Sequence, residues 1–371
     1  MVSGASDTVT VMDLLRRMVE AEASDLHMKA DAPPVLRIHG RLVSQDLPEL
    51  TAEAMKAALN QVTTSTQQEL FDREKELDFG YAADGVGRFR VNASLQRDSI
   101  ALAFRLIRTD IPTLEELGLP EVCRSVVLKP RGLVLVTGPT GCGKSTTLAA
   151  MIDHLNELER RHIVTIEDPI EYVHRNKQCL ISQRELGPDT TSFAAALKHV
   201  LRQDPDVILV GEMRDLETIA AALTAAETGH LVLATLHTPS AAQTIDRIID
   251  SFPPYQQQQI KVQLSTVLEA VLCQTLVPRA DGSGRVAAVE VMVATSAVRN
   301  LIREGKTFQT PNVIQTGSRY GMQTLDQALA ALCRANVVTA DEALARCANP
   351  EEFKRSLGTA ASSGLRTTPV Q

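Results

Sequence analysis

The chain has 371 residues, which is long for one domain and predicts two. Its net charge of −7 argues against a protein whose main task is to grip nucleic acid, although a local basic patch is not excluded. Hydrophobic residues make up 44% of the chain and aromatic residues only 3%, so aliphatic side chains must fill the core.

The six cysteines contain no C-x-x-C pair, so their spacing predicts buried thiols in a reducing compartment and no zinc ribbon. No apolar run approaches the roughly 20 residues that cross a bilayer, and the N-terminal residues lack a signal-peptide pattern. The sequence therefore predicts a cytoplasmic protein that reaches a membrane only through a partner.

Residues 1–108 are predicted to form a small α+β domain, in which residues 1 to about 8 are disordered. Apolar residues at helical spacing predict helices over 9–23, 51–60 and 65–76, and Thr51 is expected to cap the second. Alternating apolar residues predict antiparallel strands over 35–43, with a turn at Gly40, and over 77–82, 87–95 and 99–107.

Residues 109–118 are predicted to be a linker, and residues 119–355 a second domain in which strands and helices alternate, as in a parallel sheet. After Gln256 mostly helices are expected, interrupted by a hairpin around 281–284, and a disordered tail over 356–371. Within the second domain, strands are expected at 163–166, 207–210 and 231–235, and helices at 193–201 and 216–228.

The strongest motif follows the apolar run that ends at Gly138. Gly138–Ser145 matches G-x-x-x-x-G-K-[ST], and a helical pattern follows it. Glycines let the backbone wrap closely around phosphates, and a helix N-terminus favours anions. Lys144 is expected to reach the β- and γ-phosphates, and the Ser145 hydroxyl to bind Mg²⁺. A chance match in a structural glycine turn is the alternative. The expected nucleotide-binding residues here are Gly138, Pro139, Thr140, Gly141, Cys142, Gly143, Lys144, Ser145 and Thr146.

Polar residues follow three further strands, at the edge where α/β sheets bind ligands. Glu167, Asp168 and Glu171 follow the first, and near a magnesium triphosphate they would position water or the hydration shell of the metal; a solvated acidic loop is the alternative. Glu212 follows the second and is the candidate general base, although Gly211 stands where a metal-side Asp is usual.

His237 ends the third strand and is a candidate sensor of the γ-phosphate. The alternative is a polar residue that is merely hydrogen-bonded.

Arginines on the first-domain strands are candidates to stabilise phosphoryl charge from a neighbouring subunit. For any single arginine, a surface charge is the alternative. These arginines are Arg88, Arg90, Arg97 and Arg105.

Over nearly its whole length the chain resembles the secretion-ATPase superfamily and, within it, the PilT-type pilus retraction ATPases of twitching motility. The resemblance implies an α/β fold in which a RecA-like P-loop ATPase domain is preceded by a PAS-like domain, assembled as a homohexamer. The matching segments are 24–27, 138–145, 165–174, 202–206, 211–212, 227–238 and 298–304.

Residue by residue, the resemblance implies that Lys144 is the P-loop lysine, Glu212 the catalytic glutamate and Glu171 the glutamate of the acidic motif. It also implies a histidine motif and first-domain arginines that approach the nucleotide. Those residues are His230, His237, Arg90 and Arg105.

The family uses ATP and Mg²⁺ to pull pilins out of the fibre through an inner-membrane platform protein, so the expected location is the cytoplasmic face of that membrane. Cys142 departs from the usual serine and is expected to add oxidation sensitivity, and Val298 replaces an alanine. The alternatives are an accessory retraction ATPase, a pilus-assembly or type II secretion ATPase and, in another class, a nucleic-acid-binding RecA-like translocase; no nucleic acid is expected.

Overall fold

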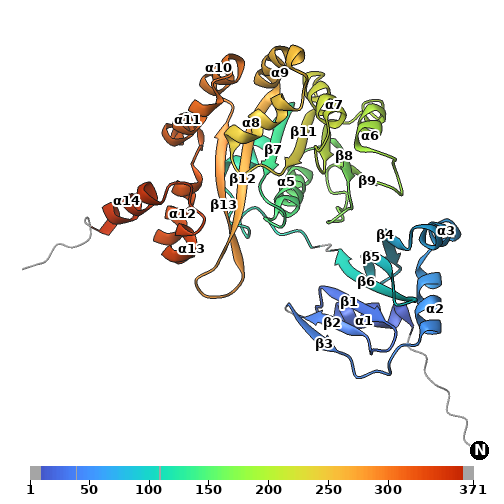
Figure 1. Ribbon diagram of the computed structural model, residues 1–371. Helices are drawn as coiled ribbons and strands as arrows, with labels where there is room; N and C mark the ends of the chain where they lie inside the picture. Colours follow the sequence, from blue (N-terminus) through green and yellow to red (C-terminus); the bar gives the residue numbers. More distant parts are fainter. Residues whose placement is uncertain (1–9, 39, 108–109, 362–371) are drawn as a thin grey trace, which may run out of the picture. The chain divides into compact units, whose positions relative to one another are not determined.

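The computed structural model describes residues 10–38, 40–107 and 110–361. The chain forms two compact units, Met1–Thr109 and Asp110–Gln371 (Figure 1). The N-terminal segment predicted to be disordered lies outside the described residues. Within the described ranges, no helix has both the length and the apolar character needed to cross a bilayer.

The first unit is a six-stranded antiparallel sheet in the order β3-β2-β1-β6-β5-β4. Its three helices share one apolar core with the sheet. The helices and strands are α1 (Val11–Glu20), β1 (Asp25–Lys29), β2 (Val35–Ile38), β3 (Arg41–Ser44), α2 (Ala52–Val62), α3 (Ser65–Glu74), β4 (Glu76–Ala83), β5 (Gly87–Gln96) and β6 (Ser99–Ile107).

Side-chain caps fix where the helices of this unit begin. The Thr10 hydroxyl accepts a hydrogen bond from the Asp13 N–H, and the Asp13 carboxylate accepts one from the Thr10 N–H, which is a capping box. Thr51 accepts a hydrogen bond from the Ala54 N–H and so caps α2, as predicted. The α+β character predicted for this unit is confirmed, although the short strand β1 was missed.

The second unit is built on a seven-stranded sheet in the order β13-β12-β7-β11-β10-β8-β9, parallel except for the edge strand β13. The predicted parallel α/β sheet is therefore confirmed. Its helices and strands are α4 (Val122–Val127), β7 (Gly132–Thr137), α5 (Lys144–Leu158), β8 (His162–Glu167), β9 (Leu180–Glu185), α6 (Phe193–Val200), β10 (Val207–Val210), α7 (Leu216–Glu227), β11 (Leu231–Leu236), α8 (Ala241–Asp250), α9 (Pro254–Val267), β12 (Leu268–Pro278), β13 (Arg285–Val293), α10 (Ser296–Glu304), η1 (Thr307–Gln309), α11 (Thr310–Thr316), η2 (Ser318–Tyr320), α12 (Leu325–Arg334), α13 (Ala340–Leu344) and α14 (Pro350–Ala361).

Helices cover both faces of this sheet, which explains why its central strands are continuously apolar. In β7, Leu133 and Leu135 face a core shared with α6, α7, α8 and α9. Val134 and Val136 point the other way, into a core shared with α4 and α5. The alternation along one strand thus joins two cores across a single sheet, and it fixes the end of β7 rigidly beside α5.

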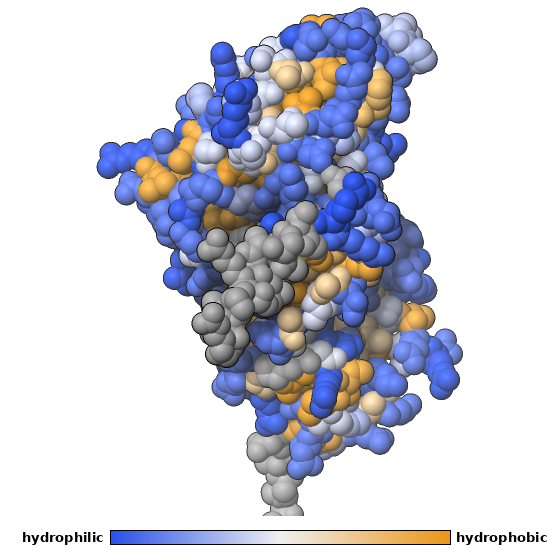
Figure 2. Space-filling view, turned by 90° about the vertical axis from the view of Figure 1, so that its left-hand side faces the viewer, coloured by the Kyte–Doolittle hydropathy of each residue, from blue (hydrophilic) through white to orange (hydrophobic). Residues whose placement is uncertain are grey.

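Hydrophilic side chains cover most of the face shown in Figure 2, and apolar side chains lie there in separate patches. This pattern is ordinary for a protein surface in water, where scattered apolar side chains need no special explanation.

In the second unit the predicted hairpin is confirmed, the predicted tail is partly wrong, and one strand was missed. The hairpin predicted around 281–284 exists but is long, because β12 and β13 pair over Ala270–Val293 as part of the main sheet. The tail predicted to be disordered from residue 356 is wrong up to Ala361, where α14 ends. The rest of that tail lies outside the described residues, and β9 was not predicted at all.

The predicted linker 109–118 is not a free tether in its described part. Leu114 is 4% exposed and belongs to the core that contains α4 and α5. Ile111, Leu117 and Leu119 pack against the same core. The segment was predicted to link two domains, but its apolar residues anchor it to the second unit.

We therefore expect Leu114→Ala to lower the free energy of unfolding by about 3 kcal/mol, because it leaves a cavity beside α5. Leu158→Ala is the matched control, since Leu158 is 59% exposed and is expected to cost less than about 1 kcal/mol. Urea unfolding followed by circular dichroism measures both. Equal losses in the two variants would show that the segment does not anchor the second unit.

Candidate active site

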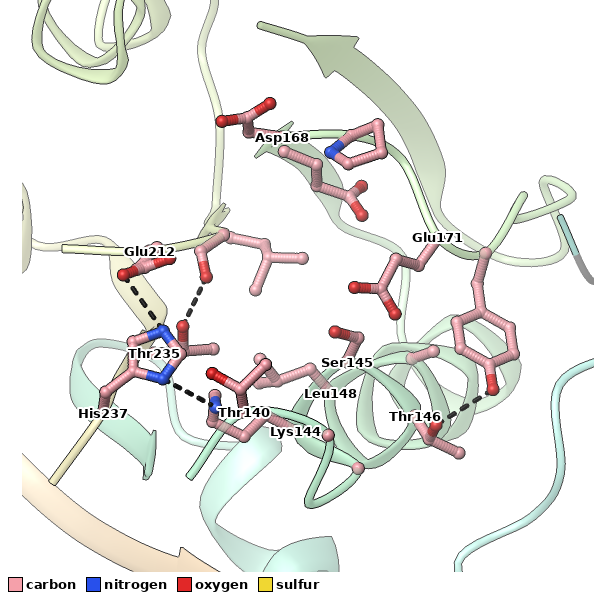
Figure 3. Close-up of a pocket in the computed structure, with 18 of the residues that line it drawn as sticks. Thr140, Lys144, Ser145, Thr146, Leu148, Asp168, Glu171, Glu212, Thr235 and His237 are labelled. Carbon is pink, nitrogen blue, oxygen red and sulfur yellow. Dashed lines mark hydrogen bonds and ion pairs between the residues drawn. The ribbon is translucent and has the colours of Figure 1, made fainter. Parts of the chain in front are cut away.

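Four loops meet at one edge of the main sheet, where the carboxyl ends of β7, β8, β10 and β11 lie together. They enclose a cavity of about 530 Å³ (Figure 3). The structure thus brings together most of the site residues predicted from the sequence. Those that line the cavity are Thr140, Gly141, Gly143, Lys144, Ser145, Thr146, Glu167, Asp168, Glu171, Glu212 and His237.

The loop between β7 and α5 needs glycine for two different reasons. Gly138, Gly141 and Gly143 have φ angles of +137°, +76° and +90°, which side chains rarely tolerate. A Cβ at Gly138 would also lie 2.2 Å from the Gln274 carbonyl oxygen, whereas one at Gly141 would meet nothing within 4 Å. Gly138 is therefore required by packing as well as by its backbone angle.

The Lys144 side chain folds back over this loop and is 9% exposed. Its Nζ donates hydrogen bonds to the carbonyl oxygens of Gly138, at 2.9 Å, and Pro139, at 3.1 Å. The same Nζ lies 3.4 Å from Nδ1 of His237. The ammonium group is thus held at the mouth of the loop, where an anion bound to the loop would meet it.

Helix α5 begins at Lys144, and Gly143 is its N-cap, with no side-chain hydrogen bond to the cap. Most other helices of the second unit start with a Ser, Thr or Asp that accepts a hydrogen bond from the first turn, as Ser192 does for α6. An uncapped helix start leaves N–H groups and a positive dipole end for an anionic ligand. The Ser145 and Thr146 side chains come from this first turn.

The acidic segment after β8 lines the cavity opposite α5, so it is not merely a solvated loop. In Figure 3 the Glu171 carboxylate points toward the Ser145 side chain. The Tyr172 hydroxyl lies 3.0 Å from the Thr146 hydroxyl and ties the segment to α5. Among the described residues no three His, Cys, Asp or Glu side chains form a cluster that could hold a metal ion, so protein carboxylates alone do not make a metal site here.

Glu167 differs from the other two carboxylates of this segment because it is enclosed. Its carboxylate accepts hydrogen bonds from the Thr165 hydroxyl at 2.6 Å and from Gln183 Nε2 at 3.1 Å. Burial nevertheless raises its pKa above the ordinary value, against the effect of these donors. Gln183 also donates to the Tyr172 carbonyl oxygen at 2.8 Å, so Glu167 helps to hold the segment in place.

Gly211 follows β10, at the position where a metal-side Asp is usual. The structure explains why a glycine lies there. A Cβ at this position would lie 3.1 Å from the Ile166 carbonyl oxygen and 3.2 Å from the Glu167 Cα. The Thr235 hydroxyl donates to the Gly211 carbonyl oxygen at 2.5 Å. Close approach of β8 leaves little room for a side chain here, and the first carboxylate of this strand end is Glu212.

Glu212 is the centre of a chain of polar contacts that joins two strand ends to the loop (Figure 3). Its Oε1 lies 2.7 Å from Nε of Arg214 and 3.1 Å from Nε2 of His237. The other ring nitrogen of His237 faces Lys144. A neutral imidazole satisfies both contacts if Nε2 donates to Glu212 and Nδ1 accepts from the ammonium group.

The contacts of Glu212 also set its charge state. Partial burial alone would raise its pKa, but hydrogen bonds from Arg214 and His237, together with the charge of Arg214, outweigh burial and lower the pKa below its ordinary value. Glu212 is therefore ionised near neutral pH. A carboxylate that is ionised, half-buried and on the cavity wall is suited to accept a proton or to orient water.

His230, which the resemblance places near the nucleotide, does not line this cavity. It immediately precedes β11, whereas His237 immediately follows it, so the length of the strand, about 20 Å, separates them. Its Nδ1 lies 2.9 Å from the Ala225 carbonyl oxygen and 3.2 Å from the Thr228 hydroxyl. These contacts fix the turn between α7 and β11.

Arg90 and Arg105 belong to the first unit, where they are directly opposite each other on β5 and β6. Arg105 Nε lies 2.8 Å from Oδ1 of the buried Asp25, and Arg37 Nε lies 3.7 Å from Oδ2 of the same carboxylate. Asp25, in the short motif 24–27, therefore offsets the charge of the facing arginines. This pairing explains the Asp of that motif, to which no role was given from sequence.

Sequence reasoning missed Arg214 and Gln274. Arg214 lies only two residues after Glu212, but nothing in the pattern marked it. Gln274 is buried on the mostly apolar strand β12, which also carries Glu269 and Thr275, so nothing in the pattern marked it either. Its Nε2 donates to the Cys142 carbonyl oxygen at 2.6 Å, and its Oε1 accepts from the Thr147 hydroxyl at 2.8 Å.

Cys142 itself is 3% exposed, and burial raises the pKa of its thiol. A buried, protonated thiol reacts slowly with oxidants, so the structure argues against the expected oxidation sensitivity at this position.

Comparison with known proteins agrees with this geometry. The model of the type II/IV secretion system protein family matches residues 8–345. The type IV pilus retraction ATPase PilT of Pseudomonas aeruginosa is 50% identical over 92% of this chain and 99% of its own length, and the type IV pilus ATPase PilU of the same organism is 44% identical over 92% of this chain and 89% of its own.

Among solved structures, the pilus retraction motor PilT with bound ADP has a TM-score of 0.88 and 44% identity, covering 93% of this chain and 99% of its own. The fold, the nucleotide-binding loop and this level of identity agree with one another along the chain. The chain therefore belongs to the type II/IV secretion system protein family, in its branch of pilus retraction ATPases.

Proposed function

We propose that this chain, an ATPase of the pilus retraction branch, works as a ring of six identical subunits that hydrolyses ATP to withdraw pilins from a type IV pilus. The observation that supports the catalytic part of this proposal is the chain of contacts Lys144, His237, Glu212. It connects the phosphate-binding loop to a half-buried, ionised carboxylate across one cavity.

In this proposal the N–H groups of the loop and of the uncapped start of α5 bind the phosphates. Lys144 neutralises charge on the β- and γ-phosphates. Glu212 orients the attacking water and takes its proton, and His237 transmits the position of the γ-phosphate from Lys144 to Glu212. Each step uses groups that already line the cavity.

The residues also fit a magnesium ion bound together with the nucleotide. Ser145 and Glu171 offer hard oxygen donors that face each other, as Mg²⁺ prefers. Because no cluster of three ligating side chains exists among the described residues, phosphate oxygens and water would complete the coordination. The ion would supply charge stabilisation for the transferring phosphoryl group.

We further propose that Arg90 and Arg105, on the PAS-like first unit of one subunit, approach the nucleotide of its neighbour. Both have guanidinium groups suited to phosphate, and in the ladder they are direct neighbours. The ring would act at the cytoplasmic face of the inner membrane by binding the platform protein of the pilus machine, with pilin as the indirect substrate.

The phenotype of a deletion strain distinguishes the proposed function from two alternatives. An accessory retraction ATPase is the first, since the chain is also 44% identical to PilU. Deleting the gene would then leave twitching motility intact, whereas loss of twitching supports the main motor. An ATPase of pilus assembly or type II secretion is the second. A deletion strain without pili would favour it, whereas a deletion strain with an excess of pili supports the retraction motor.

We expect Lys144→Ala and Glu212→Ala each to lower ATP turnover by at least about 100-fold, because the first removes phosphate charge and the second removes the base. The controls are Lys198→Ala and Glu217→Ala, which change exposed residues outside the cavity and are expected to retain turnover. Phosphate release by the purified protein, with its oligomeric state measured in parallel, tests this. Retained turnover in both cavity variants would overturn the proposed site.

A second prediction concerns pH. A base must be deprotonated, so turnover should fall only as pH drops through the pKa of Glu212, which lies below its ordinary value of 4.5. Removing the Arg214 donor in Arg214→Gln removes one of the groups that lower this pKa, and the acidic limb of the pH profile of kcat should then move to higher pH. An acidic limb that stays in place, with circular dichroism showing a folded protein, would contradict the assignment of Glu212 as base.

A further inference from the structure

Gln274 touches the phosphate-binding loop from behind, on the side away from the cavity. It lies on β12, the neighbour of β7, and the ladder places Cys273 opposite Thr137 at the end of β7. Gln274 is 5% exposed and does not line the cavity. Its side chain therefore meets the loop only through buried contacts, and it cannot act on a ligand directly.

The orientation of the Gln274 amide is fixed by its partners. The Cys142 carbonyl oxygen can only accept a hydrogen bond, so the atom 2.6 Å from it is the amide nitrogen. The amide oxygen then accepts from the Thr147 hydroxyl at 2.8 Å. Thr147 is itself 2% exposed and lies in the first turn of α5. One side chain thus links β12, the loop and the helix.

Holding the Cys142 carbonyl has a consequence for the next N–H group. A trans peptide is planar, and its C=O and N–H point in opposite directions. Because the Cys142 carbonyl is drawn toward β12, the N–H of Gly143 in the same peptide is turned to the opposite side, where Gly143 lines the cavity. A Cβ on Gly143 would lie 2.9 Å from Gln274 Nε2, so this peptide and the amide are in close contact.

We infer that Gln274 is a positioning residue for nucleotide binding: it fixes the Gly143 peptide so that its N–H faces the phosphates. The inference rests on the proposed binding of nucleotide at this loop. Thr147 assists by holding the amide of Gln274. Loss of the hydrogen bond from Gln274 to the Cys142 carbonyl should therefore weaken the contacts to the phosphates more than it weakens the contacts to the nucleoside.

Gln274→Glu is the sharpest variant, because it keeps the size and the acceptor for Thr147 but faces the Cys142 carbonyl with an oxygen that cannot donate when ionised. We expect its affinity for ADP to fall by roughly tenfold or more, with a smaller loss for AMP, so that the preference for ADP over AMP declines. Thr147→Val, which is nearly isosteric, should show the same pattern at about threefold.

Gln323→Glu is the matched control, since Gln323 also donates from its amide to a backbone carbonyl, that of Val289, at 2.9 Å, but its hydrogen bonds are with β13 and not with the loop. Titration of the full-length protein with fluorescent ADP, competed by unlabelled ADP and AMP, gives the affinities, and thermal unfolding gives the stability. Gln323→Glu should lower the melting temperature and leave the preference for ADP unchanged.

The outcomes separate the two claims. If Lys144→Ala leaves ADP binding unchanged, the proposed site is wrong. If Lys144→Ala abolishes binding but Gln274→Glu and Thr147→Val keep the wild-type preference for ADP, only the positioning role is wrong and Gln274 is a packing residue. If Gln274→Glu does not fold, Thr147→Val decides, because it removes one hydroxyl and little volume.

Discussion

The second unit depends on one constraint: a loop rich in glycine must keep its N–H groups turned toward a cavity. A free loop of this composition would sample many conformations, and ordering it costs conformational entropy. The structure limits those conformations by hydrogen-bonding the carbonyl groups of the loop, from the cavity side through Lys144 and from the opposite side through Gln274. Lys144 donates hydrogen bonds to the carbonyl oxygens of Gly138 and Pro139, and Gln274 donates one to that of Cys142. With these three carbonyl groups bound to side chains, the N–H of Gly143 remains turned toward the cavity for an anion.

The same lysine connects this constraint to the chemistry. Lys144 contacts the loop on one side and His237 on the other, and His237 contacts Glu212. An anion that draws the ammonium group away from the loop carbonyls would change the partner of His237 Nδ1, and hence the hydrogen bonding at Glu212. In the proposed mechanism, binding and catalysis would thereby be linked through three side chains, from α5, from the end of β11 and from the end of β10, with no need for a long-range movement.

Much of this arrangement could be predicted from the sequence, because the strongest signals are local. The glycine loop, the apolar strands and the polar residues that follow them are contiguous motifs, and parallel strands bring their ends together. Gln274 and Arg214 could not be predicted in the same way, since their roles depend on which strands are neighbours and on side-chain direction. His230 shares a motif with His237, but β11 lies between them and puts them at opposite ends of that strand, so only His237 lines the cavity. The anchored segment around Leu114 was missed because its apolar residues are sparse and find their partners only in the folded unit.

The position of β12 explains why a residue so far along the chain governs the loop. The sequence order of the strands would put β8 beside β7, but the sheet order puts β11 on one side of β7 and β12 on the other. Because β12 then pairs with β13 over nine residue pairs, it is held on both sides, and Gln274 lies within that paired stretch. A polar side chain on such a strand loses little freedom when it makes its hydrogen bonds, since the strand is already fixed. The rigid sheet thus provides the positional precision that the glycine loop lacks.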